Sequence, residues 1–305
     1  MFKRILFCHI PKTGGYSFLR WLKANIYELN DQERQNEPSI IKQKLFESDI
    51  VEIHGGKPIS ISKILGEDTL PYLKESLLIS IIRNPIQQYE SLCKDAYFNK
   101  AYLDLPLASR SFKNGSIEGI YNQSYKDFCF DMNSIFRLYE SFWCHQGTSD
   151  SHADKAQYKA IEYLQENQLF SQLSTRMVNS NYIFRRNSQS SYLHTAFGRE
   201  FVIKSIENPT QSLFLTTELL DRSFARLIKN SEAFRKFTIF SELPAIDEAQ
   251  ILRDLGELHV NVTHQMAAKF SKLSQENAYK FLELNKLDHT LWHAMSSFWS
   301  RILDK

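Results

Sequence analysis

Residues 5–17 of the chain, ILFCHIPKTGGYS, join a short apolar run to a loop that contains two adjacent glycines. The apolar run is nearly unbroken and has β tendency, which is typical of a strand covered on both faces in a parallel sheet. After the loop, apolar side chains recur at the spacing of an amphipathic helix, at Phe18, Leu19, Leu22 and Ile26. The order strand, loop, helix indicates an α/β fold.

Three further apolar runs predict strands, at Ile50–Ile53, residues 77–82 and Ser212–Thr216. The run at 77–82, LLISII, is the clearest, and it stops at Arg83. Asn84 is a good helix N-cap and Pro85 suits the first helical position, so we expect a helix from Pro85 through Ser91. This is a second strand-to-helix junction.

Helical periodicity returns at residues 134–144, 157–167, 219–229 and 275–303, with room for one break in the last segment. Between residues 100 and 131 the pattern weakens, and this segment is either an insertion or an irregular connection. No internal repeat or linker is evident. We therefore expect a single α/β domain over residues 1–305, with a central, mainly parallel sheet flanked by helices.

The composition favours one large hydrophobic core, since 43% of the 305 residues are hydrophobic and 13% are aromatic. The 37 basic and 35 acidic side chains leave a formal net charge of only +2. A general nucleic-acid binder would present a strongly basic surface, so nucleic acid is not an expected partner. Any site for an anion must be local.

The cysteines and the hydropathy pattern bear on the cellular compartment. The cysteines are widely spaced and form no CxxC pair, which argues against a disulfide framework and against a zinc site. They are Cys8, Cys93, Cys129 and Cys144. The N-terminal apolar run is too short for a signal peptide, and no window approaches the roughly 18 consecutive apolar residues of a membrane helix. We expect a cytoplasmic protein without an integral membrane segment.

The first loop offers the groups that a bound anion needs, and its residues are Pro11, Lys12, Thr13, Gly14, Gly15, Tyr16 and Ser17. Backbone N–H groups are unpaired where a helix starts, and glycines let a phosphate approach closely. Lys12 adds a mobile positive charge, while Thr13 and Ser17 add hydroxyl donors. The loop is not the nucleotide-triphosphate P-loop, because its lysine precedes the glycines instead of following them.

A second anion site is predicted after the strand at 77–82. Arg83 stands at the carboxyl end of this strand, where open α/β sheets bind ligands, and Ser91 lies about two helical turns further on. A guanidinium forms paired hydrogen bonds to phosphate oxygens, which a lysine cannot match in geometry. Together the two segments predict a ligand with one anionic group at each end.

These two segments, PKTGG at residues 11–15 and RNPIQQYES at residues 83–91, resemble the 5′-phosphosulfate loop and the 3′-phosphate site of a known family. The family comprises the sulfotransferases that use 3′-phosphoadenosine 5′-phosphosulfate (PAPS), especially the carbohydrate type related to heparan sulfate 2-O-sulfotransferase. The resemblance implies a P-loop-like sulfotransferase fold, PAPS as the cofactor and transfer of its sulfuryl group to a hydroxyl acceptor. Tyr16 departs from the family, which usually has Thr or Ser at that position.

Three later segments also resemble this family: TTELLD at residues 216–221, HVNVT at 259–263, and LNKLD at 284–288 ahead of Leu291 and Trp292. By family analogy, the loop around Asn261 and Thr263 closes over the nucleotide. The segment at 100–131 is then a candidate acceptor-facing insertion. The alternative for all three segments is that they are helix caps and core contacts.

Sulfuryl transfer requires an activated acceptor hydroxyl, stabilised charge on the transferring group and alignment of the reacting atoms. His54 follows the second strand beside Gly55 and Gly56, and its imidazole is a candidate general base. The family carries a His-Gly base in the corresponding segment. Glu52 should share the face of His54 by strand alternation, so it is either an alternative base or the group that orients the imidazole. Lys12 should neutralise the sulfuryl charge. No cluster has metal-ligand spacing, so no metal is expected.

The acceptor and two alternative functions stay open on sequence grounds. We expect a glycan or a glycolipid, although a small alcohol or a protein tyrosine also has a suitable hydroxyl. A P-loop kinase shares the strand, loop and helix, but its GKS or GKT motif and its magnesium-binding acidic strand end are not visible. A non-catalytic protein that binds PAPS, or its product 3′-phosphoadenosine 5′-phosphate (PAP), is the second alternative. The oligomeric state is not indicated.

Overall fold

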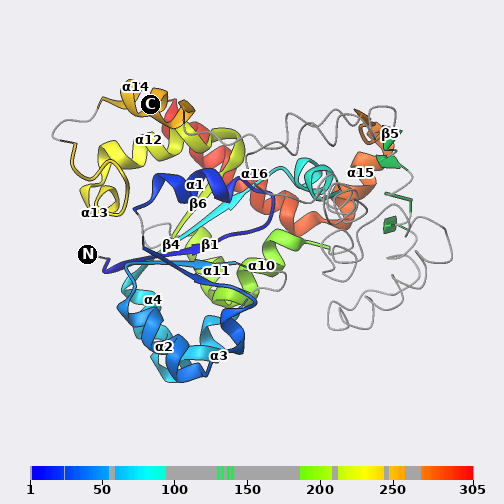
Figure 1. Cartoon of the computed structure of the whole chain (residues 1–305). Coiled ribbons are helices and arrows are strands. Elements are labelled where there is room, and N and C mark those ends of the chain that lie inside the picture. The colour runs from blue at the N-terminus through cyan, green and yellow to red at the C-terminus, as the bar shows by residue number, and fades with distance from the viewer. Residues whose placement is uncertain are drawn as a thin grey trace, which may run out of the picture. The chain divides into compact units, whose positions relative to one another are not determined.

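A computed structural model of the chain describes residues 2–23, 25–54, 59–93, 129–130, 132–133, 136–137, 139–140, 186–207, 212–243, 247–257 and 269–304. The chain divides into two compact units (Figure 1). The first comprises Met1–Asn84, Asn187–Val260 and Leu287–Lys305, and the second comprises Pro85–Arg186 and Asn261–Lys286. Such a division does not decide whether the units fold together, so a single domain over residues 1–305 stays a prediction.

The first unit is built on a five-stranded sheet with the order β2-β3-β1-β4-β6 (Figure 1). Every neighbouring pair of strands is parallel. The strands are β1 (Arg4–Cys8), β2 (Ile26–Leu29), β3 (Ile50–Ile53), β4 (Ser76–Ile82) and β6 (Ser212–Thr216). The predicted α/β fold, with a parallel sheet flanked by helices, is confirmed. All of these strands except β2 lie where apolar runs predicted them.

Successive strand residues enter hydrophobic cores on opposite faces of the sheet, as the pleat requires. In β1, Ile5 and Phe7 join one core, whereas Leu6 and Cys8 join the other, and all four side chains are fully buried. Each large apolar side chain buried in this way stabilises the fold by about 1.5–3 kcal/mol. The nearly unbroken apolar runs of the sequence are therefore strands covered on both faces.

Helices cover both faces of the sheet (Figure 1). The core around Phe7 is closed by α1 (Gly15–Trp21), α12 (Leu220–Asn230), α13 (Glu232–Arg235) and α14 (Glu248–Glu257). The core around Leu6 is closed by α2 (Pro38–Glu47), α3 (Ile61–Leu65), α4 (Thr69–Lys74), α10 (Ser188–Phe197) and α11 (Arg199–Glu207). The short 3₁₀ helices are η1 (Glu33–Gln35), η2 (Gly66–Asp68) and η6 (Thr217–Leu219). In the described part of the chain, no helix has the length and apolar character needed to cross a membrane.

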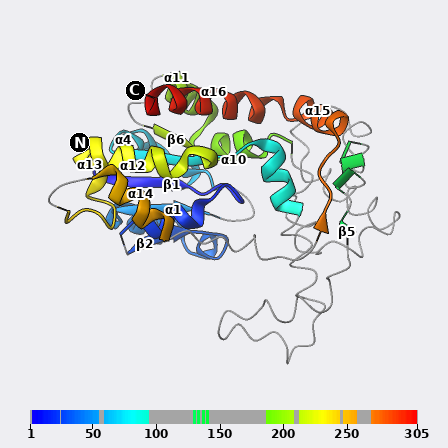
Figure 2. The same cartoon turned by 90° about the horizontal axis from the view of Figure 1, so that it is seen from above.

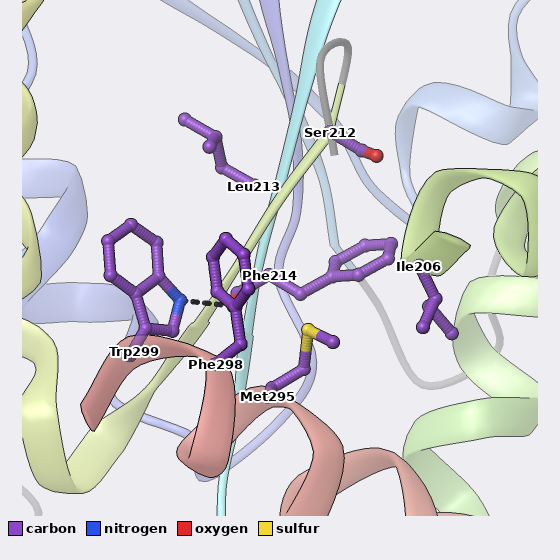
Figure 3. Close-up of a pocket in the computed structure, with 7 residues that line it drawn as sticks. All are labelled: Ile206, Ser212, Leu213, Phe214, Met295, Phe298 and Trp299. Carbon is purple, nitrogen blue, oxygen red and sulfur yellow. Dashed lines mark hydrogen bonds between the residues drawn. The ribbon is translucent and has the colours of Figure 1, made fainter. Parts of the chain in front are cut away.

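The last helix, α16 (Lys286–Leu303), runs beside β6 and α11 (Figure 2) and enters both cores, through Met295 on one side and Trp299 on the other. Trp299 Nε1 donates a 2.8 Å hydrogen bond to the carbonyl of Phe214. A cavity of about 20 Å³ remains between these elements (Figure 3), and it is lined by Ile206, Ser212, Leu213, Phe214, Met295, Phe298 and Trp299. A space of this size holds about one water molecule, so it is a packing defect and not a ligand site.

The helix after the first loop is shorter than its apolar spacing indicated. α1 ends at Trp21, and Ile26, which the spacing assigned to this helix, instead opens the edge strand β2. Leu22 leaves the helix in an extended conformation and forms a β-bridge with Thr238. Asn25 has a φ of 75°, a left-handed conformation that a right-handed helix cannot continue through. The prediction for Ile26 is therefore wrong.

The second unit, where it is described, contains packed aromatic rings. Residues 85–93 are helical and start at Pro85, as predicted. Within this helix, the ring of Tyr89 lies 4.7 Å from that of Phe281 and 5.5 Å from that of Tyr139, measured between centroids. Two short strands, β5 (Cys129–Phe130) and β7 (Lys269–Phe270), pair in parallel. Aromatic burial thus gives this unit a core of its own.

The predicted helical segments of the C-terminal half have different outcomes. The stretch at 275–303 is helical with one break, at Asn285, between α15 (Gln275–Leu284) and α16. The segment at 219–229 corresponds to α12. Residues 136–137 and 139–140, within the predicted helix at 134–144, are helical. The segment at 157–167 lies outside the described residues, as does the candidate insertion at 100–131 apart from residues 129–130.

The first turns of α10 and α16 cap each other. Asn187 Oδ1 accepts a hydrogen bond from the backbone N–H of Leu287 at 3.0 Å. The Asp288 carboxylate accepts from the backbone N–H groups of Gln189, at 2.9 Å, and Ser190, at 2.7 Å. Burial raises the pKa of Asp288 to about 6, although the hydrogen bonds from Ser190 and Gln189 act in the opposite direction. Folding therefore places a carboxyl group that ionises with difficulty at this cap.

An Asp288→Asn variant tests the buried carboxyl. Because its pKa is raised on folding, the folded protein holds a proton more tightly than the unfolded chain between about pH 4 and pH 6, and this stabilisation is lost as the pH rises through about 6. Relative to the variant, the free energy of unfolding of the wild type should fall by up to about 3 kcal/mol from pH 4 to pH 8. Urea denaturation at both pH values measures this, and a difference independent of pH would contradict it.

Candidate functional site

The strand order makes the carboxyl ends of β1 and β4 the topological switch point of the sheet, and we refer to this point as the crevice. After β1 the chain continues to β2 and β3 on one side, whereas after β4 it returns to the sheet on the opposite side, as β6. Loops that leave adjacent parallel strands in opposite directions open a crevice, and open α/β sheets bind their ligands there. The two predicted anion segments, residues 11–17 and Arg83, follow these two strands.

The loop after β1 has a tight, left-handed shape. Lys12 has a φ of 64°, and Gly14 has a φ of 97°. A left-handed conformation costs a residue with a side chain about 1–2 kcal/mol, and such strain clusters at ligand sites. Thr13 is fully buried, and its hydroxyl donates a 2.8 Å hydrogen bond to the carbonyl of Ile10. The hydroxyl proton that the sequence pattern assigned to a phosphate is thus used inside the loop.

Arg83 is joined directly to this loop. Its Nη1 donates a 3.0 Å hydrogen bond to the backbone carbonyl of Lys12. The backbone of Arg83 is held by one buried side chain, Gln189, whose amide accepts from Arg83 N–H at 2.9 Å and donates to Arg83 carbonyl at 2.8 Å. The Arg83 guanidinium therefore contacts the backbone of the first loop at Lys12, a residue distant in the sequence. The sequence analysis did not identify Gln189 as a site residue, because no local sequence pattern predicts a contact over so long a sequence separation.

Two segments that resembled the sulfotransferase family only as short motifs meet at the same edge of the sheet. Thr217 Oγ1 donates a 2.6 Å hydrogen bond to the carbonyl of Thr13, which ties the start of η6 to the loop. The Glu218 carboxylate accepts from the backbone N–H of Asn84 at 3.0 Å and from Trp292 Nε1 at 3.2 Å. The motifs at 216–221 and near Trp292 thus support the backbone on both sides of the crevice.

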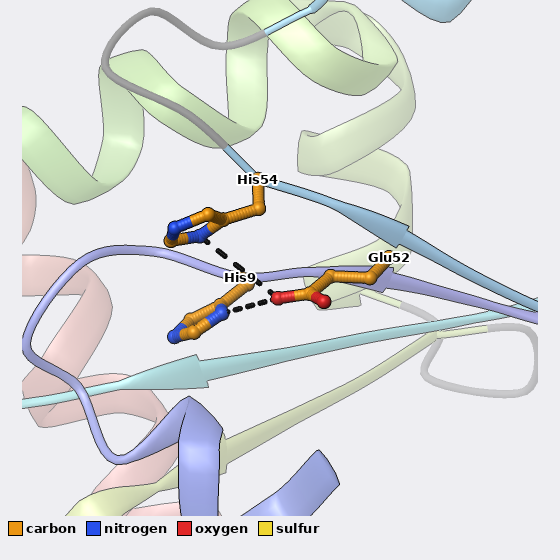
Figure 4. A group of neighbouring side chains, drawn as sticks. All are labelled: His9, Glu52 and His54. Atoms are coloured by element: carbon orange, nitrogen blue, oxygen red, sulfur yellow. Dashed lines mark hydrogen bonds and ion pairs between the residues drawn. The ribbon is translucent and has the colours of Figure 1, made fainter. Parts of the chain in front are cut away.

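An acid–base group of two buried side chains and one half-buried side chain lies beside the loop, where β1 and β3 end (Figure 4). The parallel register pairs Cys8 with Ile53, so the next residues, His9 and His54, are neighbours. His9 Nδ1 lies 2.5 Å from Glu52 Oε1, and His54 Nδ1 lies 3.9 Å from the same oxygen. Glu52 and His54 share a face of the sheet, as strand alternation predicted. His9 is a third member that sequence reasoning did not identify.

Gly15 makes room for the His9 ring. A Cβ at residue 15 would lie 2.2 Å from Cδ2 and 2.3 Å from Nε2 of His9. The ring is further enclosed by Phe7, with centroids 5.5 Å apart, and by Tyr16, at 5.2 Å. At Gly14 the constraint is different, since a Cβ there would have ordinary contacts and only the left-handed φ favours glycine. The two glycines of the loop therefore serve two separate requirements.

His54 has the electrostatic environment of a proton acceptor. Burial lowers the pKa of His54 below its ordinary value, the nearby His9 lowers it further, and Glu52 opposes both effects. Its Nδ1 is buried, and none of the described residues forms a hydrogen bond with it. A lowered pKa keeps the imidazole neutral near pH 7, and a general base must be neutral to take a proton.

His9, Glu52 and His54 are also residue types that bind transition metals, and their ligand atoms lie within 4.8 Å of one another. Two atoms bound tetrahedrally to one Zn²⁺, each about 2.0–2.1 Å from the ion, are about 3.3 Å apart. The 2.5 Å between His9 Nδ1 and Glu52 Oε1 is much shorter and matches a short hydrogen bond. As described, the arrangement is a hydrogen-bonded pair with a second imidazole beside it.

The other predicted residues of the first loop differ in exposure. The side chain of Tyr16 is 68% exposed, whereas Ser17 is buried. Pro11 and Lys12 are half-buried. Because Tyr16 also contacts the rings of His9 and His54, it presents an aromatic surface to solvent directly beside the acid–base group.

Two predicted residues are not placed relative to this loop. Ser91 is half-buried in the helical residues 85–93 and belongs to the second unit. Thr263 lies outside the described residues, as do Gly55 and Gly56. The pairing of Ser91 with Arg83 and the closure of the loop at Thr263 stay predictions.

No family model, curated protein or solved structure matches the chain. The candidate site therefore rests on its own geometry and on the resemblance of the short segments that form it. Its two parts are the cationic crevice of Lys12 and Arg83 and the acid–base group of His9, Glu52 and His54.

A double-mutant cycle tests the contact between Gly15 and His9. Gly15→Ala should destabilise the wild type by about 1–3 kcal/mol, because its Cβ would overlap the His9 ring. In a His9→Ala background the same change should be nearly neutral or stabilising, since alanine favours a helix over glycine by up to about 1 kcal/mol. The free energy of unfolding in urea gives both values.

Gly14→Ala is the matched control for this cycle. Its left-handed φ should cost about 1–2 kcal/mol in both backgrounds, because the strain does not depend on His9. An equal cost of Gly15→Ala with and without His9 would show that the cost does not come from overlap with the His9 ring, and it would contradict the packing described above.

Proposed function

We propose that this protein is a sulfotransferase that moves the sulfuryl group of PAPS to a hydroxyl acceptor. The hydrogen bond from Arg83 Nη1 to the Lys12 carbonyl carries the proposal, since it joins the two segments that resemble the family's phosphate-binding segments. They meet at the crevice where sheets of this order bind ligands. A kinase lacks a comparable argument, because the lysine of the loop precedes the glycines.

The chemistry of the crevice fits a nucleotide with anionic groups at both ends. Lys12 supplies an ammonium group, and Arg83 supplies a guanidinium that can form paired hydrogen bonds to phosphate oxygens. When bound, PAPS would supply the sulfuryl group, with PAP leaving on the electron pair of the broken sulfur–oxygen bond. Lys12 would neutralise the charge on the transferring and departing oxygens.

The acid–base group gives the second half of the mechanism. His54 would take the proton of the acceptor hydroxyl as its oxygen attacks sulfur, and its lowered pKa keeps it in the neutral form that this step needs. Glu52, 3.9 Å from His54 Nδ1, would stabilise the imidazolium that forms. No metal takes part in this scheme.

We propose a glycan or a glycolipid as the acceptor. The exposed ring of Tyr16 lies 6.4 Å from that of His54, between centroids, which offers an apolar face for a sugar next to the base. The family resemblance favours the same acceptor class. A cytoplasmic location, favoured by the cysteine spacing, belongs to the proposal as well.

Calorimetric titration with PAP tests the cationic crevice. Lys12→Ala and Arg83→Ala should each weaken PAP binding by roughly ten- to a hundred-fold, because each removes a charge-assisted contact worth about 1.5–3 kcal/mol. Lys23→Ala is the matched control, since Lys23 is an exposed cation shortly after α1, and it should bind PAP like the wild type. Equal loss in the control, or no binding by the wild type, would contradict the proposal.

Transfer of radiolabelled sulfate from PAPS to a panel of glycans and small alcohols tests the chemistry. His54→Ala should lower turnover by about 10²–10⁴-fold and leave PAP binding unchanged, because the general base acts in the chemical step. PAP binding without transfer to any acceptor, and without an effect of His54→Ala, would identify a non-catalytic nucleotide-binding protein instead.

A further inference from the structure

His9 is the most enclosed ionisable group of the site, and the proposed mechanism leaves it unassigned. Its side chain is 2% exposed and is surrounded by Phe7, Gly15 and Tyr16. Its Nδ1 faces Glu52 Oε1 at 2.5 Å. With Glu52 ionised, its carboxylate only accepts hydrogen bonds, and His9 Nδ1 is then the donor. The packing leaves the His9 ring little freedom to turn away from Glu52.

The Glu52 carboxylate therefore lies between two imidazoles and is much closer to one of them than to the other (Figure 4). Glu52 is 3% exposed, and a buried carboxylate needs a close partner to remain charged. His9 takes the close position, whereas His54 Nδ1 is 3.9 Å away and makes no hydrogen bond within the described part of the chain. Glu52 thus makes its close contact with His9 and only a longer contact with His54.

We propose that His9 is a positioning residue that holds and balances the Glu52 carboxylate, and thereby makes His54, and not Glu52, the proton acceptor of the site. The part that concerns the acceptor rests on the proposed function. The arrangement of His9, Glu52 and His54 in the free protein does not depend on the proposed function, and it can be tested without any substrate.

The groups that face His54 determine how each substitution should shift its pKa. His9 faces it from the end of β1, Glu52 from β3, Tyr16 from α1 and Asp31 from the segment after β2. After burial, the electrostatic effect of the His9 side chain is the main cause that lowers the pKa of His54, while Glu52, a hydrogen bond with the His9 backbone and Asp31 raise it. Removing His9 and removing Glu52 should therefore shift the pKa of His54 in opposite directions.

The substitutions His9→Asn and Glu52→Gln separate these effects. The amide of His9→Asn can take the place of Nδ1 and still donate to Glu52, but it carries no charge. Glu52 then acts on His54 alone, and the pKa of His54 should rise. Glu52→Gln removes the carboxylate, so the pKa of His54 should fall. Both variants keep a polar group at each position, which limits the loss of stability.

Titration of the histidine ring signals by NMR, without nucleotide, measures the pKa of His54 in the wild type and both variants, with His54→Ala to assign the signal. Opposite shifts are the expected result. An unchanged pKa in His9→Asn, or shifts of both variants in the same direction, would overturn the proposal. If His9→Asn does not fold, a fall of the pKa in Glu52→Gln is still required.

The pH dependence of turnover distinguishes the two candidate bases. In His9→Asn the acid limb of kcat/KM should move to higher pH, so that turnover on that limb falls roughly ten-fold if the pKa of His54 rises by about one and recovers at alkaline pH. In Glu52→Gln turnover should fall, because the imidazolium loses a stabilising charge, but the remaining turnover should keep an acid limb, now at lower pH. Turnover in Glu52→Gln that no longer has an acid limb, or an acid limb at the wild-type pH, would overturn the proposal. If the wild type transfers no sulfate, the proposed function fails, while the NMR titrations still decide the role of His9.

Discussion

Parallel pairing of β1 with both β3 and β4 is the constraint on which the rest of the site depends. It brings the carboxyl ends of three strands to one edge of the sheet, so that the residues after them become neighbours. Lys12 and Arg83 meet because β1 and β4 are adjacent, and His9 meets Glu52 because β1 and β3 are adjacent. The cores on the two faces fix this pairing, since a slip of one residue would turn every buried side chain to the wrong face.

The architecture follows from the sequence further than the site does. Strands buried on both faces are visible as apolar runs, and this is why β1, β3, β4 and β6 could be placed in advance. Ile26 could not, because its spacing also fits a helix and the left-handed Asn25 leaves no periodic signal. Alternation predicted that Glu52 and His54 share a face, whereas His9 joins them only through the register between two strands. Gln189 and Asp288 act across long sequence separations, which local patterns do not encode.

The residues of the short loop after β1 are each required for a different reason, and the sequence motif does not separate these reasons. Gly14 adopts the left-handed backbone conformation, Gly15 leaves space for His9, and Thr13 is hydrogen-bonded inside the loop. Residues that a phosphate-binding interpretation assigns to a ligand thus also maintain the loop and its link to the acid–base group. With no matching family or solved structure, this internal consistency is what supports the proposal of a sulfotransferase.

The central claim is that the crevice at β1 and β4 holds a nucleotide by anionic groups at both of its ends. The most direct measurement compares the affinity of the wild-type protein for PAP with that for AMP, which lacks the 3′-phosphate, by calorimetry at one fixed salt concentration. PAP should bind at least about ten-fold more tightly than AMP, since the second phosphate adds a charge-assisted contact. Equal affinity for the two nucleotides, or no measurable binding of PAP, would contradict it.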